Sequence, residues 1–209
     1  MDGKTSISAA GIPRRAVVKG AAWSVPVVAA SVAAPAFAAS TDCACFVPDT
    51  LGSGANFSVN QISGGAGVVV YNSGFGIDGT RCARTSQTYQ VTVLAATLTM
   101  SHGQSVQGRI VSGGVTNNSF ANAHGAVPAN FEFTGVSFPD GNYSSIGNTP
   151  VAQPASLSVT VRFDWDGKSC TKVLNYQFTM ANVGNFSSGQ VSGGTAVIGV
   201  AYQMTIIGI

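Results

Sequence analysis

The strongest constraint on the fold is a strictly alternating segment that ends in a turn dipeptide. Between 157 and 165 every second residue is apolar and the residues between are polar, and Asp166-Gly167 follows at once. The apolar positions are Leu157, Val159, Val161, Phe163 and Trp165. Alternation with period two places one set of side chains on one face of a β-strand. Asp-Gly tolerates the positive φ angles of a two-residue hairpin turn. This segment therefore predicts a β-hairpin with one apolar face.

A two-residue turn also predicts the register of that hairpin. The expected partners are Trp165 with Lys168, Phe163 with Cys170, Val159 with Leu174 and Leu157 with Tyr176. Apolar residues then meet apolar residues on one face, and a slip of one residue would turn all of them outward. Lys172, opposite Val161, is the exception, and we expect it near an edge or a polar opening.

The rest of the chain after Ser40 repeats this β pattern and contains no convincing amphipathic helix. The alternation in 89–100 changes phase at Leu94, and that in 131–138 changes phase around Gly135, as a β-bulge would cause. Further apolar segments occur at 57–62, 68–71, 106–111 and 196–209. These features predict an all-β fold, an antiparallel β-sandwich of immunoglobulin-like or jelly-roll type with about 8–9 strands. The segment ending at Ile209 would be a core or edge strand, and if unpaired it would be a template for another subunit.

The first forty residues differ in character from this body. Arg14 and Arg15 are followed by Lys19 and then by an alanine-rich apolar run over 20–34 that has no acidic residue. A basic head followed by an apolar middle is typical of an export signal. The stretch Arg14-Arg15-Ala16-Val17-Val18-Lys19 resembles the twin-arginine (Tat) signals of exported proteins from high-GC Gram-positive bacteria. The resemblance implies the export machinery as a partner and a secreted or cell-surface location.

A cleavage site follows the apolar run. Ala36-Phe37-Ala38 has the small-x-small pattern that signal peptidases accept, so we expect cleavage before Ala39. The expected organisation is a cleavable signal at 1–38 and a single domain at 39–209. The apolar run of the signal is nearly as long as the roughly 20 residues of a membrane span. If the signal were not cleaved, it would therefore hold the chain at a membrane.

The cysteines all lie after the expected cleavage site. An even number of cysteines in an exported domain is typical of disulfides. Cys43 and Cys45 are too close in sequence to bond each other comfortably, so each should pair with one of Cys82 and Cys170, with the choice between them open. The spacing matches no common zinc pattern, so no metal site is expected.

Charge excludes some classes of partner. After removal of the signal, six basic residues face seven acidic ones, a net charge of −1. Without a basic cluster, binding to nucleic acid has no electrostatic basis. An uncharged polar surface with a net charge near zero gives little protection from self-association.

Residues that could perform chemistry are sparse. The only histidines, His102 and His124, both precede glycine, as residues in surface turns often do. Glu132, the only glutamate, alternates with Phe131 and Phe133 and should face solvent. Neither a nucleophile elbow nor a paired-carboxylate arrangement is evident, and no ligand set for a cofactor is found.

The best candidate for ligand contact is the tip of the predicted hairpin. Trp165, with Tyr71 and Tyr143, could stack on a sugar ring, and Asp164 and Asp166 flank Trp165. The alternative is that Trp165 ends the apolar stripe of the core and that the aspartates form the turn. With Asp140, these aspartates are too sparse for a calcium loop.

The sequence therefore favours a non-enzymatic secreted or cell-surface β-sandwich with a structural or adhesive role. Such a protein would self-associate or contact a surface glycan or protein. The alternative is an exported carbohydrate-binding module or hydrolase with a site near Trp165.

Overall fold

The computed structural model describes residues 41–50, 55–143, 152–182 and 190–209, all within the compact unit Phe37–Ile209. The residues of the expected signal and cleavage site lie outside the described ranges: Arg14, Arg15, Lys19, Ala36, Ala38 and Ala39.

The described ranges contain strands, one 3₁₀ turn and no α-helix, so the predicted all-β fold is confirmed. The elements are η2 (Thr41–Cys45), β1 (Val47–Asp49), β2 (Ala55–Ser63), β3 (Ala66–Tyr71), β4 (Phe75–Asp78), β5 (Thr88–Met100), β6 (Ser105–Gly113), β7 (Val115–Ser119), β8 (Gly125–Val127), β9 (Ala129–Ser137), β10 (Gly141–Asn142), β11 (Pro154–Trp165), β12 (Lys168–Asn182), β13 (Gln190–Val191) and β14 (Ala196–Gly208).

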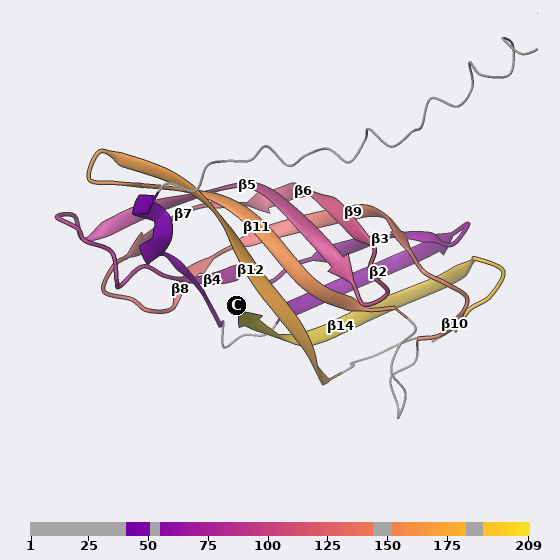
Figure 1. Ribbon diagram of the computed structural model, residues 1–209. Helices are drawn as coiled ribbons and strands as arrows, with labels where there is room; N and C mark the ends of the chain where they lie inside the picture. The colour runs from indigo at the N-terminus through magenta and orange to yellow at the C-terminus, as the bar shows by residue number, and fades with distance from the viewer. Residues whose placement is uncertain (1–40, 51–54, 144–151, 183–189) are drawn as a thin grey trace, which may run out of the picture. The chain divides into compact units, whose positions relative to one another are not determined.

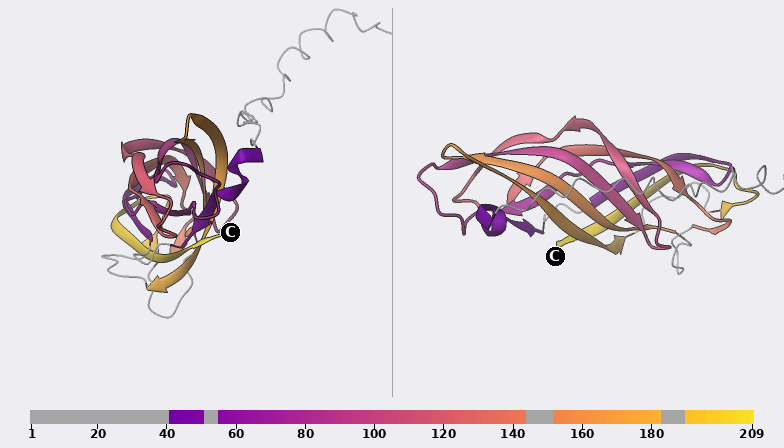
Figure 2. Two further views of the ribbon diagram at one scale, coloured as in Figure 1. Left: turned by 90° about the vertical axis from the view of Figure 1, so that its left-hand side faces the viewer. Right: turned by 45° about the horizontal axis from the view of Figure 1, so that its top comes forward.

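The main sheet is antiparallel and has the strand order β11-β12-β14-β2-β3-β9-β6-β5-β7 (Figure 1). β11 also pairs with β5, so the sheet closes on itself, as the left view of Figure 2 shows. One layer consists of β6, β5, β11 and β12, and the other of β14, β2, β3 and β9. The layers are joined where β12 pairs with β14 and β6 pairs with β9. The predicted antiparallel β-sandwich is confirmed, whereas its closure was not predicted.

The predicted register of the β11–β12 hairpin is confirmed at every pair. Trp165 lies opposite Lys168 and Phe163 opposite Cys170, and the pairing continues to Leu157 opposite Tyr176. Asp166 has the positive φ angle, 48°, that the turn requires. Alternation and turn chemistry together were sufficient to define this hairpin.

Both predicted bulges are present. The β5–β11 register shifts between Val93 and Ala95, which leaves Leu94 as an extra, exposed residue between two buried stretches of β5. On β9 the extra residue is Gly135, whose φ of 80° few other residues adopt. Each bulge keeps the apolar side chains on both sides of it inside the sandwich.

Three short strands form a second, separate antiparallel sheet. They form the sheet β1-β4-β8, and each lies close in sequence to a longer strand: β1 to β2, β4 to β3, and β8 to β9. β1 contacts β12 and β14, and β8 contacts β7. The small sheet thus lies against strands of the main sheet, and its residues Phe75, Ile77 and Val127 are buried in the core.

The core is filled by aromatic side chains. The largest fully buried side chains are Tyr71, Tyr89, Tyr143, Tyr176, Phe46, Phe57, Phe75, Phe120, Phe131, Phe133 and Phe138. Phe133 packs against the backbone of Gly108, its partner on β6, where an added Cβ would lie 2.5 Å from the ring. Gly108 therefore gives the Phe133 ring the space that it occupies.

The C-terminal strand β14 is not at an edge. It pairs with β12 on one side and with β2 on the other, and the Ile209 amide donates to the carbonyl oxygen of Asn175. Gly208 lies so close to the backbone of Pro48 that an added Cβ would be 2.6 Å from it. The sequence had left open whether this strand would be paired, and the structure pairs it on both sides.

Candidate functional site

The segment that follows the expected cleavage site is fastened to the domain by two disulfides. Cys43 bonds to Cys170 on β12, and Cys45 bonds to Cys82 in the loop between β4 and β5. The prediction that each N-terminal cysteine pairs with one of the two distant ones is confirmed. The first bond holds η2 to the β11–β12 hairpin, and the second holds it to the β4–β5 loop.

Phe46, directly after η2, is completely buried in a box of aromatic side chains. Its ring stacks on Phe163, with centroids 3.9 Å apart, and meets Trp165 edge to face at 5.2 Å. Tyr89 and Phe120 form the remaining sides, at 5.0 and 6.0 Å. The N-terminal segment is thus part of the core.

Lys172 contacts the same segment. Its alternation partner Val161 is buried, and the Lys172 ammonium donates a hydrogen bond to the carbonyl oxygen of Phe46. Partial burial lowers the pKa of Lys172 because it disfavours the charged form. At Lys172 β12 pairs with β11 alone, since β14 pairs with it only from Tyr176 onward, and the Phe46 carbonyl meets the lysine there.

Asp166 joins the tip of the β11–β12 hairpin to the loop before β5. Its carboxylate accepts hydrogen bonds from the amides of Thr85, at 2.6 Å, and Ser86, at 2.7 Å. These bonds, that of the Thr85 amide first, lower the pKa of Asp166 to about 2. The sequence indicated the turn but not this contact, because the partners are some 80 residues away.

The other residues of the hairpin tip are also occupied. Trp165 is only 6% exposed and packs on Phe46, so its ring faces the core rather than solvent. Asp164 accepts from the Arg162 guanidinium at 2.9 Å. Tyr71 and Tyr143 are likewise buried. The geometry gives no support to a sugar-stacking site built on these rings.

Like Asp166, Asp140 accepts hydrogen bonds from two successive backbone amides, but at a different turn. It accepts from the amides of Gly193 and Gly194, at 3.0 and 2.8 Å. The amide of Gly65, in the turn between β2 and β3, in turn donates to the carbonyl oxygen of Gly194. Asp140 and Asp166 therefore bind different turns, and within the described ranges no three His, Cys, Asp or Glu side chains gather as metal ligands.

One histidine has an acidic partner. His124 Nδ1 lies 2.6 Å from Asp49 Oδ2, which joins the turn before β8 to the end of β1. The His124 side chain is 75% exposed, and that of Asp49 is 22% exposed. The pair lies at the surface, where solvent weakens the attraction between its members. Its members are 75 residues apart, so sequence spacing did not reveal it.

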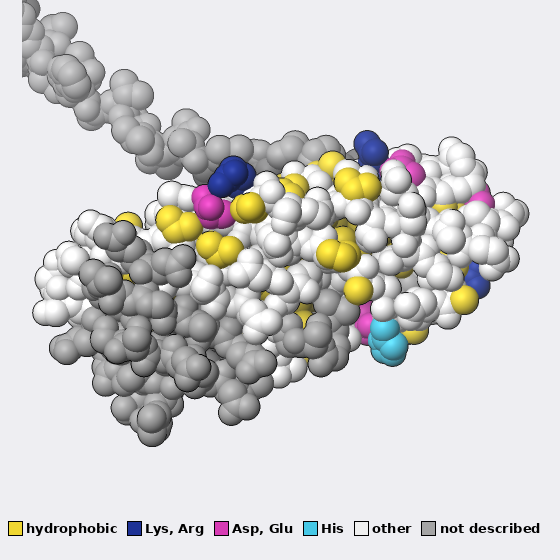
Figure 3. Space-filling model, turned by 180° about the vertical axis from the view of Figure 1, so that it is seen from behind, with side chains coloured by type: hydrophobic (Ala, Val, Ile, Leu, Met, Phe, Trp, Pro, Cys, Tyr) yellow, Lys and Arg dark blue, Asp and Glu magenta, His cyan; other side chains and the backbone are white. Residues whose placement is uncertain are grey.

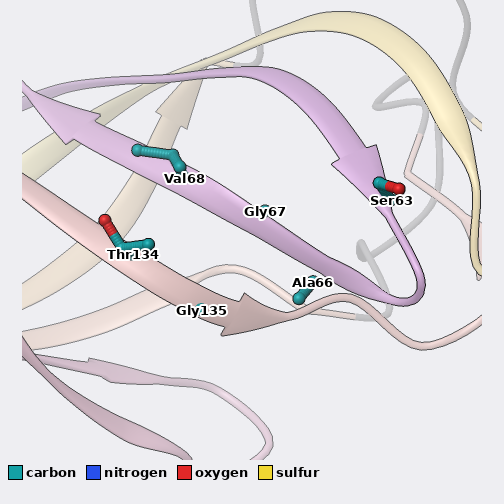
Figure 4. Close-up of a pocket in the computed structure, with 6 residues that line it drawn as sticks. All are labelled: Ser63, Ala66, Gly67, Val68, Thr134 and Gly135. Atoms are coloured by element: carbon teal, nitrogen blue, oxygen red, sulfur yellow. The ribbon is translucent and has the colours of Figure 1, made fainter.

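A shallow hollow lies on the outer face of β3 and β9. Figure 4 shows its lining, which comes from the β2–β3 hairpin and from the bulge of β9. The lining residues are Ser63, Ala66, Gly67, Val68, Thr134 and Gly135. It has no charged lining residue and is widely open, so it offers an apolar depression rather than a catalytic cleft.

No protein-family model, curated protein or solved structure matches the chain. Among the residues that the structure describes, none forms a helix that could span a bilayer.

Proposed function

We propose that this chain is an exported, disulfide-bonded β-sandwich that acts outside the cytoplasm, secreted or at the cell surface, in a structural or adhesive and non-enzymatic role. The observation that carries the proposal is the fastening of residues 43–46 to the core by two disulfides and the Phe46 ring. Disulfides form and persist in oxidising compartments. Among the described residues, buried core residues thus begin at Cys43, only a few residues after the expected cleavage site.

The filled interior supports a role carried by the outer surface. Aromatic rings occupy the space between the layers, so a partner would meet outward-facing side chains. Figure 3 shows one face of the domain, where charged side chains are few and most of the surface is uncharged. Because β14 is paired on both sides, we expect self-association not to use β14 as a free edge strand.

Export is tested by expressing the full chain in a high-GC Gram-positive host. We expect protein in the medium or cell-surface fraction that begins at Ala39 and carries both disulfides, as peptide mapping without reduction would show. The variant R14K/R15K should remain inside the cell with residues 1–38 attached. Equal export of the two forms, or exported protein that retains the signal, would contradict the proposal.

The adhesive role is tested with oxidised protein that begins at Ala39. It should co-sediment in a saturable way with cell envelopes of the host, or form larger species with rising concentration in size-exclusion chromatography with light scattering. The variant H124A should behave like the parent, because the role does not depend on the His124–Asp49 pair. A monomer that binds no envelope at any concentration would overturn the role.

A further inference from the structure

The outer face of β6, β5, β11 and β12 carries two rows of uncharged side chains in register, here called the polar grid. The first row consists of Gln107, Thr97, Ser158 and Asn175. The second row consists of Ser105, Thr99, Ser156 and Gln177. Within each row, neighbours are direct cross-strand partners, so their side chains lie on one face.

The side chains of the grid are accessible. All are exposed or half-buried, whereas their neighbours Leu98, Leu157 and Leu174 are buried. Two hydrogen bonds order the grid, Thr99 to Ser105 at 2.9 Å and Ser158 to Asn175 at 2.8 Å.

Other members of the grid keep their hydrogen-bonding capacity. The side chains of Thr97, Gln107, Ser156 and Gln177 make no hydrogen bond to another described residue. Exposed polar groups of this kind are satisfied by water, which a ligand that is rich in hydroxyl groups can replace.

The spacing and the charge of the grid define its ligand. Neighbouring strands lie about 4.8 Å apart, and residues two apart on one strand are about 7 Å apart. Extended β-linked polysaccharides present hydroxyl groups at the repeat of one pyranose unit, which is comparable with the strand spacing. Two arginines flank the grid on this face, Arg109 on β6 and Arg162 on β11. Each is paired with a carboxylate, Arg109 with Glu132 and Arg162 with Asp164. Ile207, opposite Gln177, adds an exposed apolar surface that a sugar ring can cover.

We propose that the polar grid binds a neutral β-linked polysaccharide, an inference that rests on the proposed adhesive function and names its partner. Each hydrogen bond at an exposed surface is weak because water competes for the same groups. Binding therefore depends on many contacts along one polymer, which favours a long chain over a free sugar.

Affinity electrophoresis in gels that contain hydroxyethylcellulose, laminarin or alginate tests this inference. The oxidised protein should be retarded by at least one of the two neutral polymers and not by acidic alginate. Retardation should be independent of salt, because ionic screening does not affect an uncharged contact. The variant S158E/Q177E places two diagonal carboxylates on the grid. We expect it to bind the neutral polymer at least about tenfold more weakly than the parent.

A matched control carries the same added charge elsewhere. S58E/T134E places two carboxylates on the outer faces of β2 and β9, in the other layer, and should bind like the parent. Near-ultraviolet circular dichroism and thermal unfolding establish that both variants are folded. If both variants lose binding equally, the grid is not the site and the inference is overturned.

Two further outcomes would also overturn the inference. The first is no retardation by either neutral polymer while the protein still binds cell envelopes, which leaves the adhesive function intact. The second is dimerisation that S158E/Q177E abolishes without any polysaccharide binding, because the grid would then face a second copy of the chain. Loss of envelope binding and of export would instead contradict the proposed function.

Discussion

The ring of Phe46 lies parallel to the ring of Phe163, with 3.9 Å between centroids and 2° between planes. Phe46 belongs to the N-terminal segment and Phe163 to the end of β11, so this stack joins regions that are far apart in the sequence. Gly79 makes room for it, since an added Cβ there would lie 3.0 Å from the Phe46 ring. The N-terminal segment is held by this ring as well as by its disulfides.

Truncation of this ring should be costly even when both disulfides are intact. We expect Phe46→Ala to lower the free energy of unfolding by about 3–5 kcal/mol, because it leaves a cavity among four aromatic rings. Phe46→Leu should cost less because it fills part of the space. Urea unfolding of oxidised protein measures both, and a loss below about 1 kcal/mol for Phe46→Ala would show that the box collapses around the vacancy.

The two disulfides should differ in their contribution to stability. Cys43–Cys170 closes a loop with a sequence separation of 127, and Cys45–Cys82 one of 37. The chain-entropy model assigns about 5 kcal/mol to the longer loop and about 4 kcal/mol to the shorter. We expect C43A/C170A to be less stable than C45A/C82A in urea unfolding without reductant. The reverse order would point to effects in the folded state, such as the loss of η2.

The hydrogen bonds to Asp166 predict that the stability of the fold falls at acidic pH. The pKa of Asp166 is lowered from 3.8 to about 2 in the folded protein, so its contribution to stability is complete above pH 4. It is lost as the pH falls from about 4 to about 2. Asp166→Asn keeps a side chain that tolerates the positive φ but removes the charge. The difference in melting temperature between parent and variant should be constant from pH 5 to pH 7 and should shrink toward pH 2; a difference independent of pH would contradict this assignment.

The contact between Gly108 and Phe133 predicts sensitivity to one added methyl group. Gly108→Ala should destabilise the fold by about 1–3 kcal/mol, because the ring of Phe133 must move within a packed core. In a Phe133→Leu background the same substitution should cost less, and a double-mutant cycle measures the coupling. Equal costs in both backgrounds would mean that the ring is not the cause.

Local patterns predicted much of this fold. The alternation of β11 and its Asp-Gly turn defined ten cross-strand pairs, and the changes of phase at Leu94 and Gly135 marked both bulges. These features depend on residues that are close in sequence, so the sequence alone was sufficient to predict them. β1, β4 and β8 were missed because they have only three or four residues and no alternation.

Local sequence patterns did not predict the contacts between residues that are far apart in the sequence. The pairing of β5 with β11 joins strands that are separated by more than fifty residues, and it closes the sheet. The choice of disulfide partners and the bonds from Asp166 to Thr85 and Ser86 are of the same kind. Trp165 was weighed as a ligand contact and as a core residue, and its burial against Phe46, a residue distant in sequence, shows that it belongs to the core.

The Cys43–Cys170 bond also decides how the domain would carry mechanical force. A pull on the chain before Cys43 passes through this bond directly into β12 and bypasses the residues between the two cysteines. If the opposing pull acts at the end of β14, the load lies on 170–209 alone, across the pairing of β12 with β14. Most of the sheet is then shielded from extension, and the domain would lengthen only by the part of the chain that follows Cys170.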